Sequence, residues 1–337
     1  MKTINDIARI TGVSTSTVSR VLNNHPSVSP RTRTKVIEVI KKCDYRPNAI
    51  ARSLTTKKSY TIGMFGAIFP ETNYVFHLNN DFFKDIIYGF EVVLGEKGYD
   101  LLYFTNSNLR DLSFTDKCRN RNVDGAIFLG FSKDTPNLAD FLNEEIPAVF
   151  IDTNITAKRV SYVTSTNVLG AGQAVNYLYH LGHQKIGFIR GIKGQSTAQE
   201  RIKGFKQTLV EKGLRYNQDW VISGSYSREH GYWAMNKILE NKSKPTAIFC
   251  QDLIAFGAYK AVKEHGLKIP EDISIIGFDD IDMCSYVNPP LTTIRQDRYR
   301  MGRAVGTLLL DIIDFKDDIS PIRVPTEIVE RESCRSL

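Results

Sequence analysis

Hydroxyl and guanidinium side chains gather on one short segment near the start of the chain, residues 14–20. Hydroxyl groups hydrogen-bond to phosphate oxygens, and an arginine can bond O6 and N7 of guanine together. The apolar residues of this segment recur with helical spacing and are expected to face a core. The side chains left outside are Thr15, Ser16, Ser19 and Arg20. Such a face could contact DNA, and an ordinary solvated helix face is the alternative.

Two short helices joined by a tight turn would present this face. Thr3 can cap the first helix, and Gly12 can end it with the left-handed turn that glycine adopts at little cost. A third helix is predicted to begin at Ser29-Pro30, a hydroxyl cap followed by proline at the first helical position, and to end near Cys43. Three small helices in this order are typical of a helix-turn-helix domain.

Positive charge is concentrated at the same end of the chain. Residues 1–60 hold 12 Lys or Arg against 3 Asp or Glu, a net charge of +9. The whole chain has 44 against 37, so residues 61–337 carry a net charge of −2. A cationic end on a near-neutral body is the electrostatic pattern of phosphate binding. Binding to a membrane surface is disfavoured because the basic segments lack a bulky apolar face.

From Tyr60 onward, β-branched and aromatic runs alternate with helical segments. Strands are predicted at 60–69, 100–105, 124–131, 148–152, 162–166, 185–191, 220–225, 246–251, 273–279 and 291–296. Helices are predicted at 82–97, 169–181, 197–213, 228–240, 252–265 and 299–314. This alternation predicts the α/β class, with parallel sheets covered by helices on both faces. The length suits two lobes of roughly 130 residues better than one sheet.

Several classes of protein are disfavoured by the composition. We expect neither secretion nor a membrane span, because no apolar signal segment and no run of about 18 apolar residues is found. The five cysteines are scattered without a CxxC pair, as in a reduced cytoplasmic protein. His180 and His183 flank a glycine at a helix end and are not expected to hold a metal.

Signatures of enzymes and cofactor sites are weak. The sequence GAG at 170–172 resembles the start of a dinucleotide fingerprint, but Val175 stands where its third glycine would be. No nucleophile elbow is found, and the acidic run at 279–282 lacks the spacing of a calcium loop. We therefore expect no cofactor, no metal and no enzymatic activity.

Five stretches, in a fixed order, resemble the LacI/GalR family of bacterial transcriptional regulators. They are GVSTSTVSRVLN, YRPNAIARSL, HLGHQKIGFI, IPEDISIIGFDD and PPLTTIRQD. Because they run from the head to near the end, the resemblance covers essentially the whole chain. It implies a homodimer that binds a palindromic double-stranded operator, with an affinity that changes when a small molecule binds between two lobes.

The resemblance also implies how the chain is divided. A helix-turn-helix head is expected at 1–46, a hinge helix and linker at 47–59, and an effector-binding and dimerisation core at 60–332. The core should resemble periplasmic sugar-binding proteins, in which the chain crosses between the lobes three times. The expected N-lobe holds about 60–160 and 292–320, and the expected C-lobe about 161–291 and 321–332.

The resemblance implies that Thr15, Ser16 and Arg20 lie on the recognition helix, and further polar side chains of the head are candidates for phosphate contacts. The full expected set is Thr15, Ser16, Thr17, Arg20, Asn23, Ser29, Arg31, Thr32, Asn48, Ala51 and Leu54. Leu54 is expected to insert between base pairs in the minor groove and kink the DNA, and packing on the core is its alternative role. For the hydroxyl-bearing residues, helix capping is the alternative.

The effector is expected between the lobes, where parallel strands end. A polyol needs carboxylates and amides for its hydroxyls, an arginine, and an aromatic face for its C–H groups. The expected set is Phe82, Phe83, Asp152, Arg201, Tyr226, Gln251 and Asp279. Core packing is the alternative for the aromatic residues, and a structural ion pair for Arg201 with Asp279. Gln251 departs from the family's usual asparagine, and residues 70–80 are longer than its usual first loop.

These observations predict a cytoplasmic transcription regulator, most simply a repressor of a carbohydrate-utilisation operon that responds to a small sugar. One alternative is a corepressor-dependent regulator that responds to a sugar phosphate, a purine or a partner protein. Another is a solute-binding protein, which would have no use for the basic head. An enzyme on the same fold would need a nucleophile with a neighbouring base.

Overall fold

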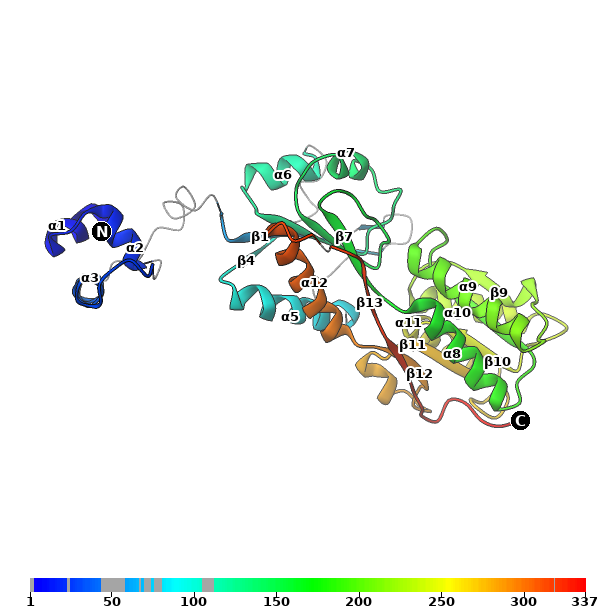
Figure 1. Cartoon of the computed structure of the whole chain (residues 1–337). Coiled ribbons are helices and arrows are strands. Elements are labelled where there is room, and N and C mark those ends of the chain that lie inside the picture. The colour runs from blue at the N-terminus through cyan, green and yellow to red at the C-terminus, as the bar shows by residue number, and fades with distance from the viewer. Residues whose placement is uncertain are drawn as a thin grey trace. The chain divides into compact units, whose positions relative to one another are not determined.

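The structure is a computed structural model, and the chain divides into two compact units, Met1–Tyr60 and Thr61–Leu337 (Figure 1). The residues that it describes are 3–22, 25–43, 58–66, 68–69, 74–75, 81–104, 112–317 and 319–337. Most of the expected hinge at 47–59 and most of the loop at 70–80 lie outside these residues. So do four of the residues expected to contact DNA, namely Asn23, Asn48, Ala51 and Leu54.

The first unit contains the helices α1 (Ile4–Thr11), α2 (Thr15–Leu22) and α3 (Pro30–Lys42). As predicted, Thr3 caps α1, and Gly12 ends it with φ at 69°. A small core joins the three helices; its buried residues are Ile7, Ala8, Val18, Val21 and Val36. Two of these come from α2, so the opposite face of α2 is left to solvent.

The second unit contains two six-stranded sheets. The first sheet is entirely parallel, in the order β13-β7-β6-β5-β1-β4. Its strands are β1 (Thr61–Gly66), β4 (Asp100–Phe104), β5 (Gly125–Leu129), β6 (Ala148–Ile151), β7 (Val160–Ser165) and β13 (Ile322–Val324). A separate antiparallel pair, β2 (Ile68–Phe69) with β3 (Tyr74–Val75), follows β1.

Helices cover both faces of the first sheet (Figure 1). The helices α5 (Asp81–Glu96) and α12 (Arg298–Ile313) pack together on one face. The short helices α6 (Phe114–Asn120) and α7 (Leu138–Leu142) cover the other face, over a cluster rich in phenylalanine. We call this sheet with its four helices the N-lobe.

The second sheet has the order β14-β12-β11-β10-β8-β9, and only β14 runs antiparallel to its neighbour. Its strands are β8 (Ile186–Arg190), β9 (Val221–Ser223), β10 (Ala247–Cys250), β11 (Ser274–Asp279), β12 (Thr293–Gln296) and β14 (Thr326–Val329). One face is covered by α8 (Asn167–His180) and α9 (Ser196–Glu211), the other by α10 (Arg228–Leu239) and α11 (Asp252–Glu264). Two short 3-10 helices complete it, η3 (Gln218–Trp220) and η4 (Asp282–Ser285). We call this sheet with its helices the C-lobe.

The predicted α/β class, with parallel sheets covered on both faces, is confirmed. The chain crosses between the lobes after β7, after β12 and after β13. These strands end at residues 165, 296 and 324, and the sequence predicts the crossings near 160, 291 and 320. Hydrophobic patterning identifies a strand but not the sheet that it joins, because pairing depends on distant partners. In the described part of the chain, no helix is both long and apolar enough to span a membrane.

Candidate functional site

The solvent-facing side of α2 is the candidate DNA-binding surface. Thr15, Ser16 and Arg20 are exposed there, as the sequence predicted. Arg31 is exposed in the first turn of α3. All four side chains are exposed to solvent, and the Ser16 hydroxyl also lies 2.8 Å from that of Ser14.

Capping engages the other expected hydroxyl groups of the head. The Ser29 hydroxyl accepts a hydrogen bond from the Thr32 backbone N–H at 3.2 Å and lies 2.9 Å from the Thr32 hydroxyl. The Thr17 hydroxyl lies 2.9 Å from that of Ser14, which caps α2. Thr17, Ser29 and Thr32 thus hydrogen-bond at the helix starts, where Ser14 and Ser29 are the capping residues, and their contact with DNA stays a prediction.

A second candidate site is a cavity in the core, with about 640 Å³ of empty space that is partly open to solvent. All seven residues predicted to bind the effector line it: Phe82, Phe83, Asp152, Arg201, Tyr226, Gln251 and Asp279. Five lining residues were not predicted: Gly130, Phe131, Gln195, Thr197 and Leu253. They follow β5, β8 and β10 closely, so the strand-end rule that found the others would also have found these.

Two partly buried aspartates approach the cavity from different lobes. Asp152 follows β6 with φ at 61°, and Asp279 ends β11 with φ at 127°. Left-handed backbone conformations of this kind are costly outside glycine and concentrate at functional sites. The Thr164 hydroxyl donates to Asp152 at 2.7 Å, and the Gln296 amide donates to Asp279 at 2.6 Å. Burial raises the pKa of both aspartates, that of Asp279 to about 7.

Arg201 is the cation of the cavity and is only 3% exposed. Its Nε donates to Asn167 at 2.8 Å, and its Nη2 lies 3.8 Å from the Asp279 carboxylate. The guanidinium stacks at 3.9 Å over the Phe278 ring. Within the described residues, the buried Nη1 has no hydrogen-bond acceptor. Because an unmade hydrogen bond of a buried donor is costly, this atom is well suited to a ligand oxygen.

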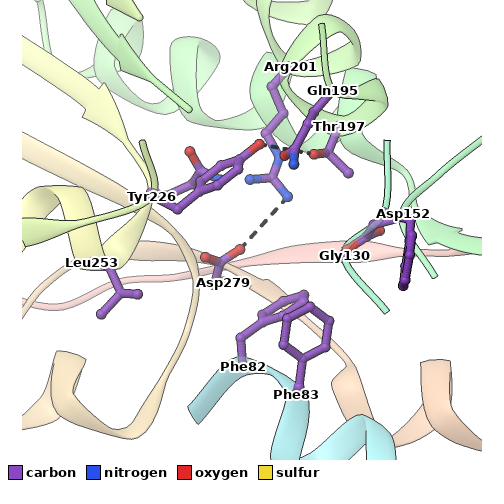
Figure 2. A pocket seen from close by; sticks show the side chains of 12 residues that line it. Phe82, Phe83, Gly130, Asp152, Gln195, Thr197, Arg201, Tyr226, Leu253 and Asp279 are labelled. Carbon is purple, nitrogen blue, oxygen red and sulfur yellow. Dashed lines mark hydrogen bonds and ion pairs between the residues drawn. The ribbon is translucent and has the colours of Figure 1, made fainter. Parts of the chain in front are cut away.

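Polar and aromatic side chains complete the lining (Figure 2). The Tyr226 hydroxyl lies 3.4 Å from that of Thr197 and hydrogen-bonds to Gln251. Burial raises the pKa of Tyr226, so its hydroxyl remains a donor. Phe82 and Phe83 at the start of α5 lie across the cavity from Arg201, with their rings edge to face at 5.1 Å (Figure 2). The arrangement combines hydroxyl-binding groups with an apolar face, as recognition of a polyol requires.

Arg298 ties the N-lobe to the strand that carries Asp279. From the start of α12 it donates to the carbonyl oxygens of Asp279 and Asp280 at 2.7 and 2.8 Å. Its Nη2 also bonds to Asp85 of α5 at 2.8 Å. The backbone that holds the cavity aspartate is therefore fixed from both lobes.

Two features that resembled cofactor or metal sites have structural roles. A Cβ atom on Gly170 would lie 2.8 Å from the Phe278 ring, so the GAG sequence allows α8 to pack closely on the sheet. The ring nitrogens of His183 lie 2.9 and 3.1 Å from the hydroxyls of Thr246 and Ser274. Its imidazole is thus engaged in the core rather than offered to an ion.

Comparisons with known proteins cover the whole chain. Residues 3–48 match the family model of bacterial regulatory proteins, lacI family, and residues 175–334 match a periplasmic binding protein-like domain. The HTH-type transcriptional repressor PurR of Pasteurella multocida is 36% identical, over 100% of this chain and 99% of the relative. The ribose operon repressor of Haemophilus influenzae is 35% identical, over 100% of both chains.

Solved structures agree with these relatives. The lac repressor dimer bound to operator and the anti-inducer ONPF superimposes with a TM-score of 0.81 and 26% identity, over 99% of both chains. The complex of the transcriptional regulator CelR with cellobiose gives a TM-score of 0.74 and 28% identity, over 99% of this chain and 100% of that one. The basic helix-turn-helix head, the two-lobed core and this similarity lead to one conclusion: the chain is a member of the LacI family of DNA-binding bacterial transcriptional regulators.

Proposed function

We propose that this protein is a homodimeric repressor whose affinity for a palindromic operator is controlled by a neutral sugar bound between the lobes. The observation that carries the proposal is the unpaired Nη1 of Arg201, in a cavity that Asp152, Asp279, Phe82 and Phe83 also line. Two relatives support a sugar as the effector. CelR was solved with cellobiose, and a LacI family regulator of Enterococcus faecium was solved with bound ribose.

The charge of the cavity favours a neutral ligand over a phosphate. Asp152 and Asp279 oppose the guanidinium of Arg201, the one cation among the lining residues that the structure describes, so a phosphate would enter a site that already holds two carboxylates. A purine or another corepressor is the second candidate, since the chain is about as similar to repressors named PurR as to a ribose operon repressor. Among the lining residues that the structure describes there is no serine, cysteine or histidine, which favours binding over catalysis.

In the head, we assign contact with DNA bases to Arg20. We assign contact with the sugar-phosphate backbone of DNA to Thr15, Ser16 and Arg31. Leu54 keeps its proposed role as the minor-groove wedge, on the grounds of the sequence alone. A sugar that binds one arrangement of the lobes more tightly would shift the dimer toward it and so change operator affinity. Such a regulator acts on the chromosome, in the cytoplasm.

Thermal unfolding of the full chain with D-ribose, cellobiose, D-glucose, ribose 5-phosphate and hypoxanthine tests the proposal. A ligand at about 100 times its Kd adds roughly 2.7 kcal/mol, a rise of several degrees in Tm. We expect a neutral sugar to give this rise and Arg201→Gln to abolish it. Arg215→Gln removes an exposed arginine just beyond α9 and should keep it. A rise with the phosphate or hypoxanthine alone would refute the neutral-sugar proposal.

A further inference from the structure

Glu200 joins the two lobes beside the cavity without lining it. It lies on α9 of the C-lobe, immediately before Arg201. Its Oε1 accepts hydrogen bonds from Asn154 Nδ2 and from Arg323 Nη2, both at 2.8 Å. Asn154 follows β6 and Arg323 lies on β13, so both donors belong to the N-lobe. One largely buried carboxylate of the C-lobe therefore holds two segments of the N-lobe.

Asn167 joins this carboxylate to the arginine of the cavity. Its Nδ2 donates to Glu200 Oε2 at 3.1 Å, and its Oδ1 accepts from Arg201 Nε at 2.8 Å. The same Nδ2 lies 3.0 Å from the Thr164 hydroxyl, which donates to Asp152. Asn167 has no exposed surface, so these bonds are not in competition with water. A continuous chain of hydrogen bonds thus runs from both charged sides of the cavity to the contact between the lobes.

We propose that Glu200 and Asn167 are positioning residues that couple the effector-binding Arg201 to the orientation of the N-lobe. The inference rests on the proposed function, in which a ligand oxygen accepts from Nη1 of Arg201. A ligand that draws the guanidinium toward itself changes the bond at Nε, and Asn167 passes this change to Glu200. The bonds of Glu200 to Asn154 and Arg323 then differ between the free and bound states, as coupling between two sites requires.

Another ion pair between the lobes lacks this connection. Lys84 of α5 bonds to Asp282 of η4 at 2.6 Å, but both side chains are well exposed. Exposed pairs of this kind contribute little, and among the described residues neither side chain bonds to one that lines the cavity. Glu200 is distinguished by its burial and by its shared partner with Arg201.

The test measures coupling in the full-length protein with D-ribose and cellobiose as probes. Operator affinity is measured by fluorescence anisotropy with and without saturating sugar, and sugar affinity by calorimetry. In Glu200→Gln, which replaces one acceptor oxygen by an amide donor, we expect the effect of sugar on operator affinity to fall at least fivefold. The Kd for sugar should change less than threefold. Asn167→Asp keeps an acceptor for Arg201 but places a second carboxylate beside Glu200. We expect the same results for this variant as for Glu200→Gln.

Two further variants make the result specific. Glu211→Gln has the same change of charge at the exposed end of α9 and should retain the wild-type coupling. Arg323→Gln breaks the Glu200–Arg323 ion pair at Arg323, which is the more exposed of the two residues. If Glu200→Gln does not fold, Arg323→Gln is used in its place. In the double variant with Glu200→Gln, the effect of sugar on operator affinity should fall by less than a further twofold, because both substitutions remove the same bond. If Glu200→Gln and Asn167→Asp both keep the wild-type effect of sugar on operator affinity, the proposal is wrong. It is also wrong if that effect is lost only because the Kd for sugar rises at least tenfold.

Amide hydrogen exchange without ligand separates this inference from the proposed function. If neither sugar binds the wild-type protein, the sugar-effector proposal fails on that result alone. The contact between the lobes can still be followed through the backbone amides of residues 152–167 and 320–330. These amides should exchange at least tenfold faster in Glu200→Gln than in Glu211→Gln. Equal exchange in the two variants would show that Glu200 does not hold the lobes together and would overturn the inference.

Discussion

Asp152 and Asp279 place ionisable groups where they cost the folded protein free energy. Both are partly buried, both have a positive φ, and one oxygen of each accepts a hydrogen bond from a neighbouring side chain. A polyol that donates to their remaining oxygens would offset part of this cost. Residues that are unfavourable for the free protein and favourable for a complex are typical of binding sites.

Sugar affinity should fall as the pH drops below about 7. Burial raises the pKa of Asp279 to about 7, although Arg201 opposes the shift. A sugar hydroxyl donates to the ionised carboxylate, so binding lowers this pKa and releases a proton near neutral pH. For one proton the loss of affinity is at most about tenfold per pH unit. Calorimetry in buffers of different ionisation enthalpy would detect the proton, and Asp279→Asn should abolish its release. The same release in that variant would count against this assignment.

Arg20→Ala should weaken operator binding by about 1–3 kcal/mol, the usual contribution of a bidentate contact to guanine. The core is untouched, so the Kd for sugar should not change. Arg9→Ala removes an equal charge from α1, where Arg9 pairs with Asp6. Anisotropy titrations against a palindrome selected by the wild-type protein would compare the two. Equal losses would mean that Arg20 contributes only its charge.

At the scale of elements, three pairs of helices approach one another through glycine. They are α5 with α12, α8 with α9, and α10 with α11. A Cβ atom on Gly302 of α12 would clash with the backbone of Ile86 on α5. In the same way Gly204 faces Val168, and Gly257 faces Arg228. The helices that flank both sheets can therefore pack backbone against backbone.

Gly302→Ala should destabilise the core by about 1–3 kcal/mol, because the extra methyl group forces α5 and α12 apart. Gly95→Ala is the matched control, since Gly95 lies on exposed α5 surface with nothing within 4 Å of an added Cβ. That substitution should raise stability by roughly 0.4–1 kcal/mol. Urea unfolding of both variants measures the difference. Equal stability would show that the two helices can separate at no cost.

At the scale of the whole molecule, charge divides the two binding functions. The first 60 residues carry +9 and the remainder −2, so DNA and the proposed neutral effector would bind to electrostatically different units. This separation allows the head to search DNA through general electrostatic attraction while the core selects its ligand by shape and hydrogen bonding.

Salt should therefore affect the two activities differently. Operator affinity should fall by roughly 10³-fold or more between 50 and 200 mM salt if six or more phosphates are contacted. The Kd for a neutral sugar should stay within about twofold over the same range, because no counterion is displaced. Parallel titrations at several salt concentrations test both statements. A sugar-site affinity that falls steeply with salt would identify an anionic effector instead.

Much of this protein could be predicted from local sequence. Caps and periodicity determine the helices of the head, since Thr3, Gly12 and Ser29 act on their own neighbouring residues. The order of strands and helices determined the α/β class. The seven cavity residues could be predicted to meet because carboxyl ends of parallel strands lie at one edge, and because the family resemblance named the positions.

Only the tertiary structure decided which strands share a sheet and which side chains share a hydrogen-bond acceptor. The crossings between the lobes depend on pairings such as β13 with β7, about 160 residues apart, which no local pattern records. The bonds of Glu200 to Asn154 and Arg323 likewise join segments 46 and 123 residues away. Local sequence selects the elements and the chemistry they offer, whereas contacts between distant segments decide which of those groups are left for a ligand.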